Sequence, residues 1–234
     1  HVPPVEVVSY RLSHRGKPVG TQTIKTAYLG RQAQLENRSQ FQGAFGVGTV
    51  VQRSRCHAQG VSLRFLEETQ ERSDNRKFDV VFDAKAGLVT AAKGPKDNAQ
   101  APYLLPYRDP LSLLHEIRQL GELEGPYLVP LLGKEVTVQL AGEVELDTVL
   151  GKRRARAYVL HPGQSLVYVD VEAPHTILKL TQRLPDGHLD ALLVKVATEA
   201  SIDPFGEPTE PRGKGGKSGR RRGQRRRPRR RKRN

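Results

Sequence analysis

The chain has 234 residues, with 39 Lys or Arg against 25 Asp or Glu, and a formal charge of +14. Residues 212–234 contain 14 of the basic residues and no acidic one, so residues 1–211 carry 25 of each kind. A neutral body with one charged end excludes a fold whose whole surface binds a polyanion.

Cysteine usage and the chain start narrow the class of protein further. Cys56 is the only cysteine, which excludes an internal disulfide and a thiolate-rich zinc site. No apolar stretch approaches the roughly 18 residues that a membrane helix needs. The chain begins with His1 and contains no Met. We expect either that an export signal has been cleaved or that the sequence starts inside a longer chain.

Apolar residues alternate with polar ones along most of the body. Examples are residues 61–65, 78–82 and 166–171, and turn residues separate these runs, most clearly Pro185-Asp186-Gly187. This pattern predicts roughly ten to twelve short strands at the even spacing of a sandwich or barrel. We therefore expect a mainly β domain over residues 1–201, an antiparallel meander that forms a curved sheet or open barrel.

One hairpin can be given a register. With Leu150-Gly151 as the loop, Asp147 faces Arg154 and Glu145 faces Arg156, while Leu146 and Val144 stack on Ala155 and Ala157 of the other face. The acidic row could be a catalytic or metal-binding site. A solvated ladder of cross-strand ion pairs is the simpler interpretation, because basic partners stand opposite.

Residues 109–120 are the exception to the β pattern and predict one amphipathic helix of about eleven residues. Asp109 suits the N-cap position, Pro110 the first helical turn, and Gly121 the end of the helix. The apolar stripe contains Leu113, Leu114, Ile117 and Leu120. We expect this stripe to face the concave side of the sheet, where Leu113, Leu114 and Ile117 either fill a core or line a site for an apolar ligand.

The C-terminal end differs in composition from the body. Residues 202–211 form a Pro-rich linker, and residues 212–234 form an Arg-rich tail that we expect to be disordered when unbound. Dense cationic segments bind polyanions with little sequence preference, and the tail contains no aromatic side chain for base stacking. The predicted polyanion-binding residues are Arg220, Arg221, Arg222, Arg225, Arg226, Arg227, Arg229, Arg230, Arg231, Lys232 and Arg233.

The sequence contains only weak candidates for a catalytic or metal site. The Gly43, Gly46 and Gly48 spacing matches no phosphate-binding loop, and adjacent Cys56 and His57 would point to opposite faces of a strand. A further candidate is a zinc site formed by His161, His175 and His188. Another is an acid–base pair formed by Asp170 and Glu172. Scattered surface histidines explain the first set more simply, and no pocket-defining partner accompanies the second. We therefore predict no enzyme, no cofactor and no metal.

The body resembles a bacterial family, domain-of-unknown-function family 3108, over roughly residues 5–198. The resemblance rests on Tyr10-Arg11-Leu12 leading to Pro18-Val19-Gly20-Thr21, on the run 78–83, on Asp109-Pro110-Leu111-Ser112 opening the helix, and on Leu166-Val167-Tyr168-Val169 before a hairpin at Asp186-Gly187. It implies a barrel-like antiparallel sheet around one helix, commonly in exported envelope proteins, and it brings no reaction. The arginine tail departs from the family pattern.

Two functions follow from these observations. The first is a non-enzymatic binding or scaffold protein of the bacterial cell envelope or periplasm, tethered by its tail to an anionic polymer or surface and able to hold a lipid-like ligand. The second is a cytoplasmic protein whose tail binds DNA or RNA. The charges alone fit nucleic acid, anionic lipid and envelope polymer equally.

Overall fold

The computed structural model describes residues 4–72, 74–94 and 96–199, in which fourteen strands form one sheet. The predicted linker and tail, residues 202–234, lie outside the described residues. The strands are β1 Val5–His14, β2 Lys17–Leu29, β3 Gln32–Phe41, β4 Gly48–His57, β5 Ser62–Glu71, β6 Asp74–Asp83, β7 Leu88–Gly94, β8 Asp97–Pro102, β9 Tyr127–Leu131, β10 Lys134–Thr148, β11 Gly151–His161, β12 Ser165–Asp170, β13 Ile177–Leu184 and β14 Gly187–Glu199.

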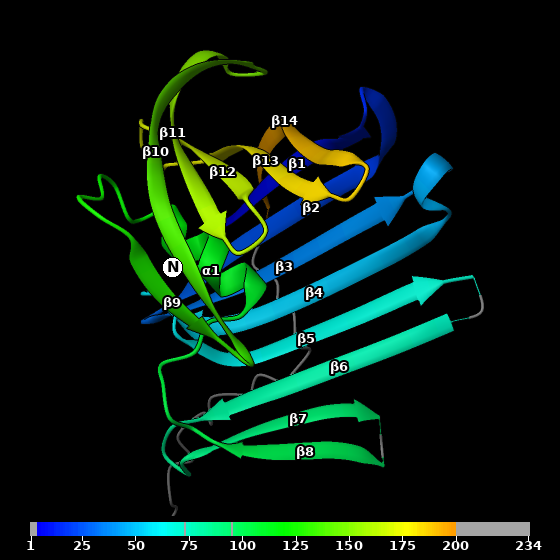
Figure 1. Ribbon diagram of the computed structural model, residues 1–234, viewed down its shortest axis with the longest axis vertical. Coiled ribbons are helices and arrows are strands. Elements are labelled where there is room, and N and C mark those ends of the chain that lie inside the picture. The colour runs from blue at the N-terminus through cyan, green and yellow to red at the C-terminus, as the bar shows by residue number, and fades with distance from the viewer. Residues whose placement is uncertain (1–3, 73, 95, 200–234) are drawn as a thin grey trace, which may run out of the picture.

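Strands β1 to β8 pair in chain order, as do β9 to β14, and β1 also pairs antiparallel with β14. The meander is therefore continuous through the first and last strands, and its two free edges are β8 and β9, between which the chain forms its helix. Figure 1 shows β9 to β13 curling over that helix while β4 to β8 extend as a more open surface. The prediction of a mainly β, curved and open antiparallel sheet with one helix is confirmed, with more strands than the sequence pattern indicated.

The helix α1 spans Pro110–Ile117, and its start agrees with the prediction. Asp109 is the N-cap, and its side chain and that of Ser112 form a reciprocal capping box. The helix is shorter than predicted, because the chain leaves helical geometry after Arg118 and Gly121 adopts a φ of +64°. Gly121 accepts a hydrogen bond at its carbonyl from the Tyr158 hydroxyl, which fixes the chain beyond the helix.

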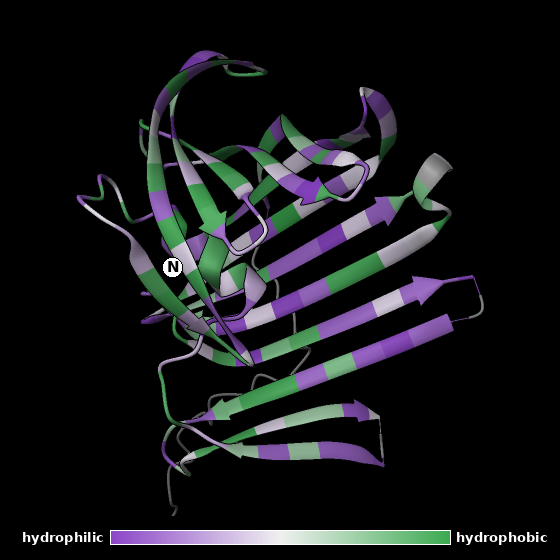
Figure 2. Cartoon of the chain, in the orientation of Figure 1, coloured by the Kyte–Doolittle hydropathy of each residue, from purple (hydrophilic) through white to green (hydrophobic). Residues whose placement is uncertain are grey.

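Two apolar cores lie between the sheet and α1. Figure 2 shows hydrophobic and hydrophilic residues alternating along most strands, as a sheet with one buried face requires. The larger core joins Ile117 of the helix to strands β1, β2 and β9 to β14 and includes Tyr10, Val138 and Leu178. The smaller core packs Leu111 against β3 to β7. The helix thus contacts both halves of the sheet.

The predicted register of the β10–β11 hairpin is wrong by two residues. Val149-Leu150 forms the loop, because Gly151 already belongs to β11, and Glu145 faces Arg154 while Glu143 faces Arg156. The charged row remains an ion-pair ladder, with Arg154 Nε 3.1 Å from Glu143 Oε2. The apolar partners shift as well, so that Val144 faces Ala155.

Candidate functional site

The N-terminus of α1 is fixed to the sheet by a buried carboxylate. Asp109, 3% exposed, accepts hydrogen bonds from the hydroxyls of Ser54 on β4 (2.7 Å) and Ser62 beside it on β5 (2.6 Å). It also accepts from the backbone N–H groups of Leu111 and Ser112, both at 2.9 Å. Burial raises the pKa of Asp109, and these hydrogen bonds offset part of the rise because they favour the charged form.

A second polar cluster joins the segment before α1 to its last turn. Arg108 pairs bidentately with Glu116, with Nε 2.7 Å from Oε2 and Nη2 2.9 Å from Oε1, and both side chains are about one-tenth exposed. Tyr127 of β9 donates its hydroxyl to Glu116 Oε1 at 2.6 Å. Gly60 packs so closely that a Cβ there would lie 2.9 Å from Glu116 Cβ, at a φ of +92°. Only glycine suits this contact.

The C-terminal end of α1 is tied to the first strand. Arg118 pairs bidentately with Glu6 of β1, with Nη1–Oε1 and Nη2–Oε2 distances of 2.6 and 3.0 Å. Arg118 also donates to the carbonyls of Pro174 and His175. Three polar anchors therefore hold a helix of eight residues in one position against the sheet.

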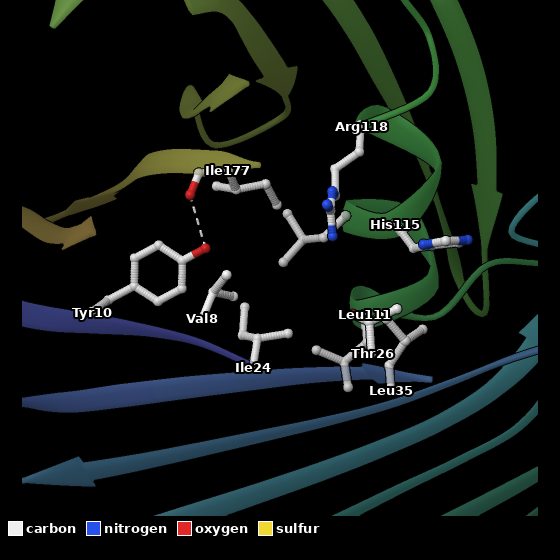
Figure 3. Close-up of a pocket in the computed structure, with 10 residues that line it drawn as sticks. Val8, Tyr10, Ile24, Thr26, Leu35, Leu111, His115, Arg118 and Ile177 are labelled. Atoms are coloured by element: carbon white, nitrogen blue, oxygen red, sulfur yellow. Dashed lines mark hydrogen bonds between the residues drawn. The ribbon is translucent and has the colours of Figure 1, made fainter. Parts of the chain in front are cut away.

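Beneath the helix the core is almost filled. A cavity of about 20 Å³ remains there. Figure 3 shows its lining, with Leu111, His115 and Arg118 of the helix segment on one side and strand residues such as Val8 and Ile24 on the other. Its volume suffices for about one water molecule. The Tyr10 hydroxyl closes it by donating to the Ile177 carbonyl at 2.9 Å. Ile117 is 0% exposed and belongs to the packed core.

A much larger chamber, about 460 Å³, lies on another side of α1. The predicted residues Leu113 and Leu114 line it, together with Pro110 at the start of the helix. The opposing wall comes mainly from apolar side chains of β1 and β9 to β14, namely Leu12, Leu131, Val136, Leu160, Leu166, Val167, Leu180, Leu189 and Ala191. The volume falls in the range of about 300–1,000 Å³ that small-molecule sites occupy.

A row of amides crosses the polar wall of this chamber. Gln22 Nε2 on β2 donates to Asn37 Oδ1 on β3 at 3.0 Å, and Asn37 Nδ2 donates to Gln52 Oε1 on β4 at 3.0 Å. Gln52 Nε2 then donates to Glu67 Oε2 on β5 at 2.7 Å. Ser39 lies beside the row and accepts from Asn37 Nδ2 at 3.4 Å. The sequence prediction missed these residues, although each interrupts the apolar alternation at an inward position.

The weaker sequence candidates are held in ion pairs or lie on opposite strand faces. Glu172 lies beyond the end of β12, not on a shared strand face with Asp170, and Arg153 pairs with both carboxylates. Cys56 is buried and His57 exposed, as opposite faces require, and burial raises the pKa of the Cys56 thiol to about 12. A high pKa makes the thiol a poor nucleophile.

The described part of the chain shows neither a metal-binding cluster nor a membrane-spanning helix. Residues 4–72, 74–94 and 96–199 contain no group of three His, Cys, Asp or Glu that could hold a metal ion, so the candidate set His161, His175 and His188 does not converge there. No helix within those ranges is long and apolar enough to cross a bilayer. The eleven predicted polyanion-binding residues of the tail, Arg220 to Arg233, lie outside the described residues.

Comparisons with known proteins support the fold. No family model and no curated protein matches the chain, so the resemblance to family 3108 stays a prediction. Among solved structures, the chain is similar to a β-barrel-like protein of domain of unknown function DUF1849 from Brucella abortus, with a TM-score of 0.57 and 11% identity. The match covers 85% of this chain and 99% of that one. At this identity the likeness shows a shared β-barrel-like architecture.

Proposed function

We propose that this chain is a non-catalytic binding protein that holds an apolar or lipid-like ligand in the chamber beside α1. The observation that carries the proposal is the chamber itself, about 460 Å³ in volume and lined by Leu113, Leu114 and apolar residues of the curled strands. Binding sites for small molecules are typically concave, largely preformed and mostly apolar, with a few placed polar groups. The chamber has each of these properties.

The rigidity of the helix supports the same proposal. Asp109, Arg108 and Arg118 fix α1 from three directions, so the chamber does not depend on the helix closing over a ligand. A preformed site binds with less loss of conformational entropy than one that must be ordered first.

A dye titration of the full chain tests ligand binding. A naphthylamine dye, whose fluorescence rises in apolar surroundings, should bind the wild-type protein. The variants Leu166→Phe and Val50→Phe place a ring in the chamber and should bind the dye about tenfold more weakly, which corresponds to about 1.4 kcal/mol. Val194→Phe is the matched control, because Val194 is 41% exposed. Equal dye binding by all four proteins would refute the chamber as the site.

We further propose that residues 212–234 tether the protein to an anionic polymer or surface of the bacterial cell envelope. The support is the sequence: 14 basic residues without an acidic one, arranged in closely spaced arginine blocks. Arginine pairs bidentately with phosphates and carboxylates. If six to ten charges contact phosphates, affinity should fall by about three to five orders of magnitude between about 50 and 200 mM salt.

A full-length variant in which the eleven residues of the arginine blocks become Gln tests the tether. The wild type should bind phosphatidylglycerol vesicles and the variant should not, while both bind the dye equally. The alternative function, a cytoplasmic protein that binds nucleic acid, rests on the same charges and predicts tighter binding to duplex DNA or RNA than to vesicles. Equal vesicle binding by wild type and variant would exclude the tail as a tether.

A further inference from the structure

The polar wall of the chamber has a defined hydrogen-bonding direction. Glu67 stands at one end of the amide row, and an ionised carboxylate accepts hydrogen bonds but cannot donate them. Gln52 must therefore turn its NH₂ group toward Glu67, at 2.7 Å, and its carbonyl oxygen toward Asn37. The same logic orients Asn37 and then Gln22. One acceptor thus fixes three amides that could otherwise flip.

This orientation leaves particular atoms free to meet a ligand. Gln22 begins the row, so its side-chain carbonyl oxygen accepts no hydrogen bond from another amide of the row. Ser39 uses an oxygen lone pair to accept from Asn37, which leaves its O–H as a donor. Asn37 and Ser39 are 4% and 6% exposed, and both line the chamber. The wall therefore offers acceptors and donors together, from neutral groups.

Charge on the chamber lining is sparse. Among the described residues that line it, none is a carboxylate, and the one cation is Lys134, an exposed side chain at the start of β10. Thr181 also lines the chamber, but its hydroxyl is committed to Asp190 Oδ1 at 2.7 Å. At the amide row itself a charged ligand group would lose hydration and meet only neutral polar groups of β2 to β4, and that exchange is unfavourable.

Resting on the proposed function, we infer that the chamber selects single-chain amphiphiles with an uncharged, hydroxyl-bearing head group. The apolar chain lies against the leucine-rich wall of β9 to β14 and α1, and the head group hydrogen-bonds to Gln22 and Ser39 of the amide row. A hydroxyl both donates and accepts, so it can use the Gln22 carbonyl and the Ser39 O–H at once. The chamber's volume, in the lower half of the usual range for ligand sites, favours one chain over two.

A competition experiment on the full chain tests this head-group selectivity. The bound naphthylamine dye is displaced by amphiphiles of one chain length that differ only in the head group: a monoacylglycerol, the free fatty acid and an alkyltrimethylammonium. The wild type should prefer the monoacylglycerol over both ions by about tenfold, the effect of one or two hydrogen bonds made or left unmade. In Gln22→Leu that preference should shrink to about twofold, while the dye still binds.

Control variants and outcomes separate this inference from the proposed function. Ser39→Ala is a smaller change in the same wall and should also reduce the preference, which guards against a folding defect in Gln22→Leu. Gln40→Leu, an exposed position on the same strand as Ser39, should leave the preference unchanged. If the dye binds and all three head groups compete equally, or the fatty acid wins, the selectivity is refuted and the chamber remains a site. If the dye does not bind the wild type, the proposed function itself fails.

Discussion

Arg118 and Glu6 join the last turn of the helix to the first strand through two charge-assisted hydrogen bonds, at 2.6 and 3.0 Å. Arg118 is 11% exposed and Glu6 is 22% exposed, so the pair is largely shielded from water. The two residues are separated by more than a hundred positions in the chain, and β1 is also the strand that pairs with β14. This ion pair therefore links the helix to β1, where the first and last strands of the chain pair.

Removal of this pair should destabilise the fold. Arg118→Met leaves Glu6 and the carbonyls of Pro174 and His175 without their donor, and we expect the free energy of unfolding to fall by about 3 kcal/mol. Urea unfolding followed by circular dichroism measures the change. Arg76→Met is the control: its pair with Asp74 is exposed, and its loss should change stability far less than the loss of the Arg118 pair. Equal effects of the two substitutions would contradict this account of the helix anchor.

Stability should also depend on His115 at mildly acidic pH. His115 is 2% exposed, its Nε2 lies 3.1 Å from the Ala58 carbonyl, and its Nδ1 has no partner. Burial lowers the pKa of His115 below its ordinary value of 6.5, and Arg118 lowers it further, while the hydrogen bond with the Ala58 carbonyl and the charges of Glu116 and Glu6 oppose the shift. The unfolded chain then binds a proton that the folded chain does not, so stability falls as the pH drops below the unfolded pKa.

A comparison of two histidine variants isolates this effect. The free energy of unfolding of the wild type should decrease from about pH 7 to pH 5, with a contribution from His115 of at most about 1.4 kcal/mol per pH unit. His115→Gln should remove that contribution. His57→Gln, at an exposed position, should keep the wild-type slope. A slope unaffected by His115→Gln would show that another group titrates.

Cys56 should be nearly inert in the folded protein. The thiol is 0% exposed and its pKa is raised to about 12, first by burial and next by the charge of Asp109. Reaction with a colorimetric disulfide reagent near pH 8 should be about three orders of magnitude slower in the native protein than in guanidinium. If Cys56 of the native protein reacted fully within seconds, before any unfolding, that result would contradict the packing described for β4.

Two positions of the predicted apolar stripe should behave differently on truncation. Ile117→Ala empties a fully buried core site and should lower the free energy of unfolding by about 2–5 kcal/mol. Leu114→Ala changes a partly buried side chain that borders both cavities, and should lower it by only about 1 kcal/mol while dye binding persists. Chemical denaturation and the dye titration measure both quantities. Loss of dye binding in Ile117→Ala without loss of stability would reverse the roles assigned here.

Local patterns were sufficient to predict the start of the helix and the mainly β character of the chain. Asp109, Pro110 and Ser112 carry the N-cap, first-turn and capping-box preferences within a few positions, so the helix start could be predicted from neighbours alone. The alternation in β5, β6 and β12 likewise reflects one buried face. By contrast, the helix end is set by the chain beyond it, where Tyr158 holds Gly121 and Arg118 meets Glu6.

The predicted register of the β10–β11 hairpin was wrong for a physical reason. Acidic residues occupy alternate positions of β10 and basic residues alternate positions of β11, so a shift by two residues pairs opposite charges equally well. The loop decides between the registers: Thr148 Oγ1 accepts from the Leu150 N–H at 3.1 Å and donates to the Gly151 carbonyl at 2.9 Å, closing the turn one position earlier. Charge pairing alone cannot distinguish these alternatives.

The amide row of the chamber and the carboxylate at its end could not be predicted from the sequence. Gln22, Asn37, Gln52 and Glu67 come from four strands, and their alignment follows from the registers of β2 to β5. An isolated Gln or Asn at an inward strand position has no distinctive spacing. Only the pairing of strands shows that these four residues form one row.

A crystal structure of the full chain grown with a monoacylglycerol tests the central claim most directly. We predict density for the acyl chain between Leu113, Leu114 and the leucines of β12 to β14, with the glycerol oxygens within hydrogen-bond distance of Gln22 and Ser39. A chamber without the amphiphile at saturating concentration, or the amphiphile bound only elsewhere on the sheet, would contradict the account.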